Sequence, residues 1–127
     1  MALILIVDDS PTEVHVIKKA LEKHGYQTAT AADGAEGIRL AKQMKPDLIF
    51  MDVVMPGVNG FQATRTLAAD PETKRIPVIM VTSKSQPSDR VWGMRQGAVD
   101  YLVKPVSEAV LVAKAQEVLE RNESAGA

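Results

Sequence analysis

The chain has 127 residues, of which 46% are hydrophobic, a length and composition that suit one domain with a buried core. Its 15 basic and 16 acidic residues nearly cancel, which argues against the strongly basic surface that electrostatic binding of nucleic acid requires. It contains no cysteine, which excludes disulfides and thiolate metal sites and fits a reducing compartment.

The first predicted strand, Leu3–Val7, is apolar throughout, as is typical of a parallel strand that is buried on both faces. A helix is predicted to start at Pro11 and to end near Gly25. Ser10 is the expected cap of this helix, Pro11 suits the first helical position, and Glu13 is expected to complete a capping box. The segment therefore indicates a strand, a short loop and a helix.

A mixed run, Gln27–Ala31, indicates a strand at an edge of the sheet, and Gly34–Met44 carries the pattern of a second helix. Leu48–Met51 is again apolar throughout, so a third, buried strand is expected there. A third helix is predicted to begin after Asn59, which suits the cap position. The residues expected on the inward face of this helix are Phe61, Thr64 and Leu67.

The last part of the chain repeats the alternation. Val78–Val81 is predicted to be a buried strand, Pro87–Gln96 a helix, and Tyr101–Val103 a short strand at the other edge of the sheet. Ser107 is the expected cap of a fifth helix. The apolar stripe of that helix is expected to consist of Val110, Leu111, Ala115, Val118 and Leu119.

This order of elements predicts an α/β domain in which right-handed crossovers place helices on both faces of a parallel sheet. In such sheets, ligands bind beyond the carboxyl ends of the strands. Asp8 and Asp9 follow the first strand, and Asp52 follows the third. If these strands are neighbours, the three carboxylates crowd together and require a cation, because unpaired buried charge is unfavourable. The sequence therefore predicts a site for Mg²⁺, a hard cation that prefers oxygen ligands.

Each signal also has a purely structural explanation when it is taken alone. Asp8 or Asp9 could merely assist the start of the first helix, and Asp52 could be an ordinary acid in the loop after the third strand. Lys104 before Pro105 could be a surface lysine at a turn, and Thr82 is a residue type that strands favour. Pro56 and Gly57 suit a type II turn that needs no function. The two acidic groups together, each at the end of a buried strand, favour the metal site.

The order of these signals resembles the receiver domain of two-component response regulators. Acids follow the first and third strands, a hydroxyl residue follows the fourth, and a Lys-Pro pair follows the fifth. The resemblance covers nearly the whole chain, so we expect a receiver domain over residues 1–121 and a flexible tail over 122–127. It implies a flavodoxin-like, doubly wound five-stranded sheet in the order 2-1-3-4-5, with five helices. The residues that carry it are Asp8, Asp9, Asp52, Thr82, Lys104 and Pro105.

The resemblance also implies a role for each matching residue. Asp52 is the expected phosphoacceptor. Asp9 and Asp52 are expected to hold Mg²⁺ directly with the backbone carbonyl of Val54, while Asp8 acts largely through water. Lys104 is expected to contact the phosphoryl group. The expected switch residues are Thr82, which would turn toward the phosphoryl group, and Tyr101, which would move inward to follow it. A cis bond is expected before Pro105.

Three longer stretches, 8–13, 55–65 and 91–98, are similar to stand-alone receivers of type IV pilus twitching motility, a chemotaxis-like system. The resemblance implies a histidine kinase as phosphodonor and a pilus-motor or signalling target that docks on the fourth helix, the fifth strand and the fifth helix. We expect a cytoplasmic monomer that binds neither nucleic acid nor membrane. The first apolar run reaches an acidic residue too early for a signal peptide or a membrane span.

Three alternatives remain open at this point. A phosphate sink would use the same chemistry to drain phosphoryl groups from the kinase without binding a target. An aspartyl-phosphate phosphatase of the haloacid dehalogenase type places its two acids two positions apart, whereas Asp8 and Asp9 are adjacent. A degenerate receiver that acts only as a scaffold would lack phosphorylation residues that are all present here. We therefore expect a switch that catalyses only its own phosphorylation and dephosphorylation, not an enzyme with other substrates.

Overall fold

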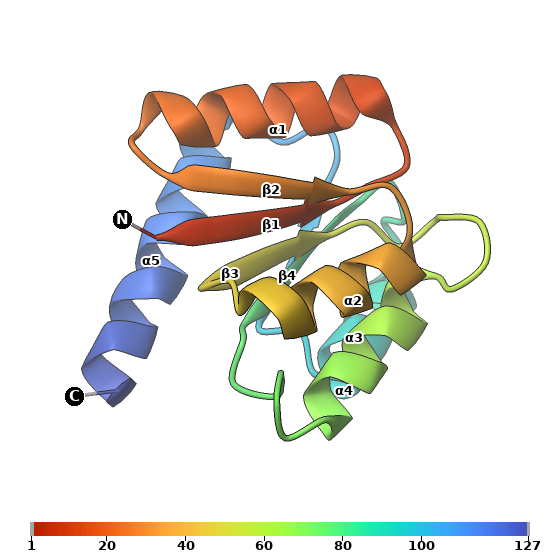
Figure 1. Ribbon diagram of the computed structural model, residues 1–127. Coiled ribbons are helices and arrows are strands. Elements are labelled where there is room, and N and C mark those ends of the chain that lie inside the picture. Colours follow the sequence, from red (N-terminus) through yellow and green to blue (C-terminus); the bar gives the residue numbers. More distant parts are fainter. Residues whose placement is uncertain (1, 127) are drawn as a thin grey trace.

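The computed structural model of the protein describes residues 2–126, with side chains up to residue 122. Over these residues, five strands alternate with five helices (Figure 1). The strands are β1 (Leu3–Val7), β2 (Gln27–Ala31), β3 (Leu48–Met51), β4 (Val78–Thr82) and β5 (Asp100–Val103). The helices are α1 (Pro11–Lys23), α2 (Gly34–Met44), α3 (Gly60–Ala69), α4 (Pro87–Gln96) and α5 (Glu108–Gly126).

The strands form one parallel sheet in the order β2-β1-β3-β4-β5. This order confirms the predicted topology, with β2 and β5 at the edges. Val7 of β1 lies beside Met51 of β3 in the register, so these two strands end at the same level. The order of strands reverses between β1 and β3, and the carboxyl ends of this pair therefore mark the crevice where α/β sheets bind ligands.

Helices cover both faces of the sheet, with α1 and α5 on one side and α2 and α3 on the other (Figure 1). Phe50 of β3 is buried in the first layer together with Leu111 of α5. Met51, the next residue, is buried in the second layer together with Leu67 of α3. Consecutive residues of a strand point to opposite faces, so a strand covered on both sides must be apolar throughout. This is why the central strands read as continuous apolar runs.

The predicted stripe of α5 is wrong at one position. The side chain of Val110 is 46% exposed, and Val112, which was not expected inside, is buried. Leu111, Ala115 and Val118 are buried as predicted. These three repeat at the spacing of one helix face, and Val110 lies one position off that row, where it turns away from the sheet.

The C-terminal helix α5 continues through residue 126, beyond the point where the sequence predicts a flexible tail. Ala127, the last residue of that predicted tail, lies outside the described residues. The flexibility of residues 122–127 stays a prediction, because helical geometry alone does not measure motion. Neither α5 nor any other helix within residues 2–126 is long and apolar enough to cross a membrane.

Asp100 joins three elements at the β5 edge of the sheet. The Lys114 ammonium of α5 lies 2.8 Å from its carboxylate, and the Arg90 guanidinium of α4 lies 3.5 Å from it. The backbone N–H of Tyr101 also donates to this carboxylate, at 2.8 Å. Burial by itself would raise the pKa of Asp100, but the hydrogen bonds from Lys114 and Tyr101 outweigh burial and lower it. The folded state therefore favours the ionised carboxylate.

Asp100→Asn is expected to lower the free energy of unfolding by about 1 kcal/mol at neutral pH. The folded-state pKa lies below the unfolded-state value, so this stabilisation is complete above the ordinary pKa of aspartate, about 3.9. It is lost as the pH falls through the folded-state pKa. Urea unfolding of both proteins at neutral pH and at about pH 3 measures the effect. A difference that persists undiminished in acid would contradict it.

Thr64, which was predicted on the inward face of α3, carries a polar atom without a partner. Its side chain is 1% exposed, and within the described residues its hydroxyl has no hydrogen-bond partner. Thr64→Val replaces the hydroxyl with a methyl group, so we expect the free energy of unfolding to rise by about 1 kcal/mol. The urea midpoint should rise at an unchanged slope, and a lower midpoint would show that the hydroxyl is satisfied.

Candidate functional site

Two strand ends bring three carboxylates together. β1 ends at Val7 and is followed by Asp8 and Asp9, and β3 ends at Met51 and is followed by Asp52. The backbone N–H of Asp52 donates to the Val7 carbonyl at 2.9 Å, which holds the two ends side by side. One oxygen atom from each carboxylate lies within 4.8 Å of the others. The predicted crowding of acids at this edge is therefore confirmed.

The surroundings of Asp52 favour a bound cation. Asp8 and Asp52 are buried, whereas Asp9 is exposed. Burial, and then the charge of Asp8, raises the pKa of Asp52. Lys104 and the Val53 N–H, which donates to Asp52 at 2.8 Å, offset this only in part. Oxygen ligands with excess negative charge suit a hard divalent cation, so this set of donors fits Mg²⁺.

Lys104 brings a positive charge to the cluster. Its Nζ lies 2.9 Å from Asp8 Oδ2 and 3.7 Å from Asp52 Oδ2. Its backbone N–H donates to the Thr82 carbonyl at 2.8 Å, which places it just beyond the paired ends of β4 and β5. Burial alone would lower the pKa of Lys104, but the bond to Asp8 and the charge of Asp52 raise it, so the ammonium form is held. The bond before Pro105 is cis, as the resemblance implies.

Thr82 and Tyr101, the two expected switch residues, are linked through the main chain of Lys84. Thr82 ends β4 and is fully buried, and its hydroxyl accepts the Lys84 N–H at 3.3 Å. The Tyr101 hydroxyl donates to the Lys84 carbonyl at 2.8 Å. Burial raises the pKa of Tyr101 to about 12, which keeps this hydroxyl protonated. The resemblance implies an inward movement of Tyr101, and in this conformation the side chain is already buried.

Two glycines position the loop after Asp52. Gly57 has a φ of 73°, as the expected type II turn requires, and the Val54 side chain before it is 58% exposed. The role of the second glycine, Gly60, was missed by sequence reasoning. A Cβ atom at Gly60 would overlap the carbonyl oxygen of Asp52 and lie 2.8 Å from its carbonyl carbon. Only glycine therefore lets α3 start directly against the end of β3. A single sequence carries no pattern that signals this contact.

The capping box predicted at the start of α1 is wrong in one half. The Ser10 hydroxyl does accept the Glu13 N–H, at 3.3 Å. The Ser10 N–H, however, donates to Asp8 Oδ1 at 2.9 Å. The Asp8 carboxylate reaches it because the two residues form a local aspartate turn. The carboxylate of Glu13 lies instead 3.9 Å from Lys104 Nζ, so the sequence analysis missed a fourth acid beside the site.

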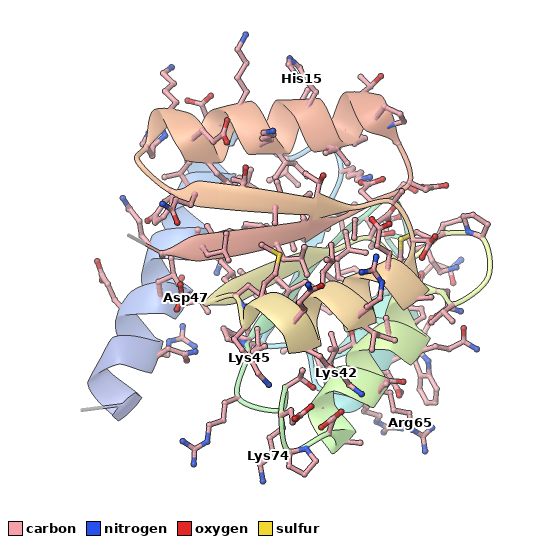
Figure 2. The ribbon with its side chains drawn as sticks, viewed as in Figure 1. His15, Lys42, Lys45, Asp47, Arg65 and Lys74 are labelled. Carbon is pink, nitrogen blue, oxygen red and sulfur yellow. The ribbon has the colours of Figure 1, made fainter. Side chains whose placement is uncertain are left out.

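His15, Asp47 and Lys42 lie away from this edge. Figure 2 shows His15 pointing outward from α1, away from the sheet. Asp47 lies at the opposite end of the sheet, where its carboxylate accepts the Leu3 N–H at 2.8 Å. Lys42 of α2 pairs with Asp70 at 3.0 Å (Figure 2). These groups contribute to the surface and to local stability rather than to the acidic cluster.

The comparisons with known proteins agree on one family. The family model described as response regulator receiver domain matches residues 4–116. Protein PilH of Pseudomonas aeruginosa is 59% identical over 119 residues, which cover 94% of this chain and 98% of that protein. Response regulator PleD of Caulobacter vibrioides is 38% identical over 117 residues, which cover 92% of this chain but only 26% of that protein. The matching part of PleD is thus one segment of a longer chain.

Solved structures show the same architecture. The chemotaxis protein CheY4 of Vibrio cholerae matches with a TM-score of 0.87 and 34% sequence identity. The match covers 93% of this chain and 98% of that chain. Together with the family match, it confirms the resemblance that was inferred from the residues at the strand ends.

Proposed function

Because this chain belongs to the response regulator receiver domain family, we propose that it is a stand-alone phosphoacceptor switch. In this proposal, Asp52 accepts a phosphoryl group from a histidine kinase in a Mg²⁺-dependent reaction. The observation that carries it is the meeting of three carboxylates at one sheet edge, with the Lys104 ammonium 3.7 Å from Asp52. Such an arrangement suits phosphoryl transfer, because the transferring group and its acceptor are both anionic and need positive charge between them.

The proposed transfer is a displacement at phosphorus. A bond forms between an Asp52 oxygen and phosphorus while the bond from phosphorus to the kinase imidazole nitrogen breaks, and that nitrogen keeps the electron pair. Mg²⁺ held by Asp9, Asp52 and the Val54 carbonyl, with Asp8 acting largely through water, would neutralise charge on the phosphoryl oxygens. One Asp52 oxygen is held by the following backbone N–H, and the other faces Lys104. Lys104 would thus add a second positive charge to the transferring group.

Signalling would follow from a new partner for the Thr82 hydroxyl. In the structure, that hydroxyl accepts the Lys84 N–H, and Tyr101 bonds the Lys84 carbonyl. A rotation of the Thr82 side chain that brings its hydroxyl to a phosphoryl oxygen, as donor, would carry the oxygen away from the Lys84 N–H, and the shift of the Lys84 main chain would reach Tyr101. A contact that exists in only one state shifts the equilibrium between two conformations.

The proposed signalling surface consists of α4, β5 and α5. Its support is a group of exposed apolar side chains on or beside these elements, which is typical of a surface that binds another protein. They favour a switch with a target over a phosphate sink, and competition with a sister receiver for kinase phosphate would separate the two. The exposed side chains are Val91, Trp92, Val99, Val103 and Val110.

We place this switch in the cytoplasm, as a monomer, in type IV pilus twitching motility or chemotaxis-like control, on the strength of the likeness to PilH and CheY4.

Incubation of the full chain with acetyl phosphate and Mg²⁺ tests this proposal. We expect intact-mass measurement to show one added phosphoryl group. We expect no addition when EDTA removes the metal, because repulsion between the anionic donor and the acidic cluster is then unopposed. A chain that takes up no phosphoryl group with Mg²⁺, or takes it up equally with EDTA, would contradict the proposal.

A further inference from the structure

Glu13 is an acid beside the site that the proposed reaction does not use. It lies in the first turn of α1, and its carboxylate is 3.9 Å from the Lys104 ammonium. The capping role that its spacing predicted is filled by Asp8, which accepts the Ser10 N–H. The Glu13 side chain is 44% exposed, against 9% for Asp52, so it meets Lys104 from a more solvated position.

Lys104 is shared among three carboxylates. Asp8 holds its ammonium in a hydrogen bond at 2.9 Å, while Asp52 and Glu13 attract it from 3.7 Å and 3.9 Å. Coulomb attraction varies inversely with distance, so Asp52 and Glu13 pull with comparable strength, apart from the stronger screening at Glu13. Asp52 follows β3 and Glu13 belongs to α1, so the two pulls come from different elements. Lys104 is therefore attracted in part to Glu13, which lies outside the cluster of Asp8, Asp9 and Asp52.

We propose that Glu13 is a positioning residue that restrains Lys104 and thereby slows phosphoryl uptake at Asp52. The inference rests on the proposed function. As the phosphoryl group arrives, the Lys104 ammonium must move toward the oxygens beside Asp52, where negative charge accumulates during transfer. Attraction to Glu13 opposes this movement. Neutralising Glu13 frees Lys104 for the transferring group and speeds uptake.

The test compares Glu13→Gln with wild type during phosphorylation by acetyl phosphate and Mg²⁺. Glutamine keeps the length of the side chain and removes its charge. We expect uptake to be about 2- to 5-fold faster, the size that fits removal of one half-exposed ion pair. The wild-type rate should approach that of the variant as salt rises, because ions screen the Glu13–Lys104 attraction. Glu13→Asp, which keeps the charge, should restore a rate close to wild type.

Beryllium fluoride, a phosphoryl analogue that binds carboxylates, gives a second readout without group transfer. In Mg²⁺, we expect Glu13→Gln to bind it more tightly, by a factor similar to the gain in rate. A residue that only stabilised α1 would lower the melting temperature when replaced and would not tighten this affinity. Glu120→Gln is the charge-matched control, because Glu120 is exposed and belongs to the C-terminal half of α5. That half of α5 lies at the opposite end of the sheet from the carboxyl ends of the strands (Figure 1). The uptake rate of Glu120→Gln should equal that of wild type.

The outcomes separate the two proposals. If wild type takes up no phosphoryl group, or Asp52→Asn takes it up equally, the proposed function fails and the inference about Glu13 falls with it. If wild type is labelled at Asp52 but Glu13→Gln reacts at the wild-type rate or more slowly, only the inference is overturned. An equal acceleration in Glu120→Gln would also overturn it, because the effect would then reflect net charge.

Discussion

Asp52→Asn is expected to take up no phosphoryl group from acetyl phosphate in Mg²⁺, whereas the wild-type chain takes up one. The amide of asparagine lacks the charged oxygen that attacks phosphorus, and its neutral oxygen is a weaker ligand for a hard cation than a carboxylate. Intact-mass measurement gives the result directly. Asp47→Asn is the matched control, because its carboxylate bonds the Leu3 N–H at the far end of the sheet. That variant should be labelled like wild type.

The same substitution at Asp52 should raise the stability of the fold when Mg²⁺ is absent. Burial, and then the charge of Asp8, raises the pKa of Asp52. An acid with a raised folded-state pKa weakens the fold above that pKa, because its ionised form is less favourable in the folded than in the unfolded chain. Asparagine removes this charge at neutral pH. Thermal unfolding should therefore show a higher midpoint for Asp52→Asn than for wild type.

Mg²⁺ should act in the opposite direction, by stabilising wild type more than Asp52→Asn. A ligand that binds only the folded state raises its stability, and the metal site in the variant has lost one carboxylate. Adding Mg²⁺ should raise the midpoint of wild type more than that of Asp52→Asn. Equal labelling of the two proteins, or an equal response to Mg²⁺, would contradict the role assigned to Asp52.

Gly60→Ala is expected to lower the free energy of unfolding by about 3 kcal/mol. The added Cβ atom would overlap the carbonyl oxygen of Asp52, a backbone atom that cannot swing aside as the end of a long side chain can. The Gly60 N–H donates to the Val53 carbonyl at 2.9 Å, so α3 is anchored to the same segment. Either α3 must move away from the sheet or the end of β3 must shift, and phosphoryl uptake should fall with the displaced carboxylate.

Gly57→Ala separates this clash from the general effect of replacing a glycine. Gly57 has a positive φ of 73°, but no described heavy atom beyond its chain neighbours lies within 4 Å of the position of a Cβ atom. Alanine there should cost about 1 kcal/mol through backbone strain alone. Urea denaturation measures both variants. A Gly60→Ala chain as stable as Gly57→Ala would contradict the packing argument.

The acidic cluster could be predicted because it depends on local patterns. A strand that is covered on both faces must be apolar to its end, so the first acid after it marks the edge of the sheet. Met51 followed by Asp52 carries this signal, as does Val7 followed by Asp8. The alternation of strands and helices then implies a parallel sheet, whose carboxyl ends share one edge. Fold class, strand order and the meeting of the acids follow from these facts and the resemblance.

Contacts between distant segments could not be predicted in the same way. The spacing of Ser10 and Glu13 fits a capping box, and nothing local shows that Asp8 takes the backbone N–H first. The approach of Glu13 to Lys104 depends on where α1 lies relative to the end of β5. Gly60 reads as a helix start, and only the packing of α3 against β3 shows why a side chain is excluded there.

The bonds from Thr82 and Tyr101 end on the main chain of Lys84, not on its side chain. Every residue type except proline carries both of these peptide groups, so the coupling survives almost any replacement at this position. The Lys84 side chain, meanwhile, lies near α4, where its ammonium is 3.7 Å from Asp89. Mutation can therefore alter the charge and shape of the surface at this point without breaking the internal connection. If the protein is the switch proposed above, partner preference and switching are thus free to evolve separately.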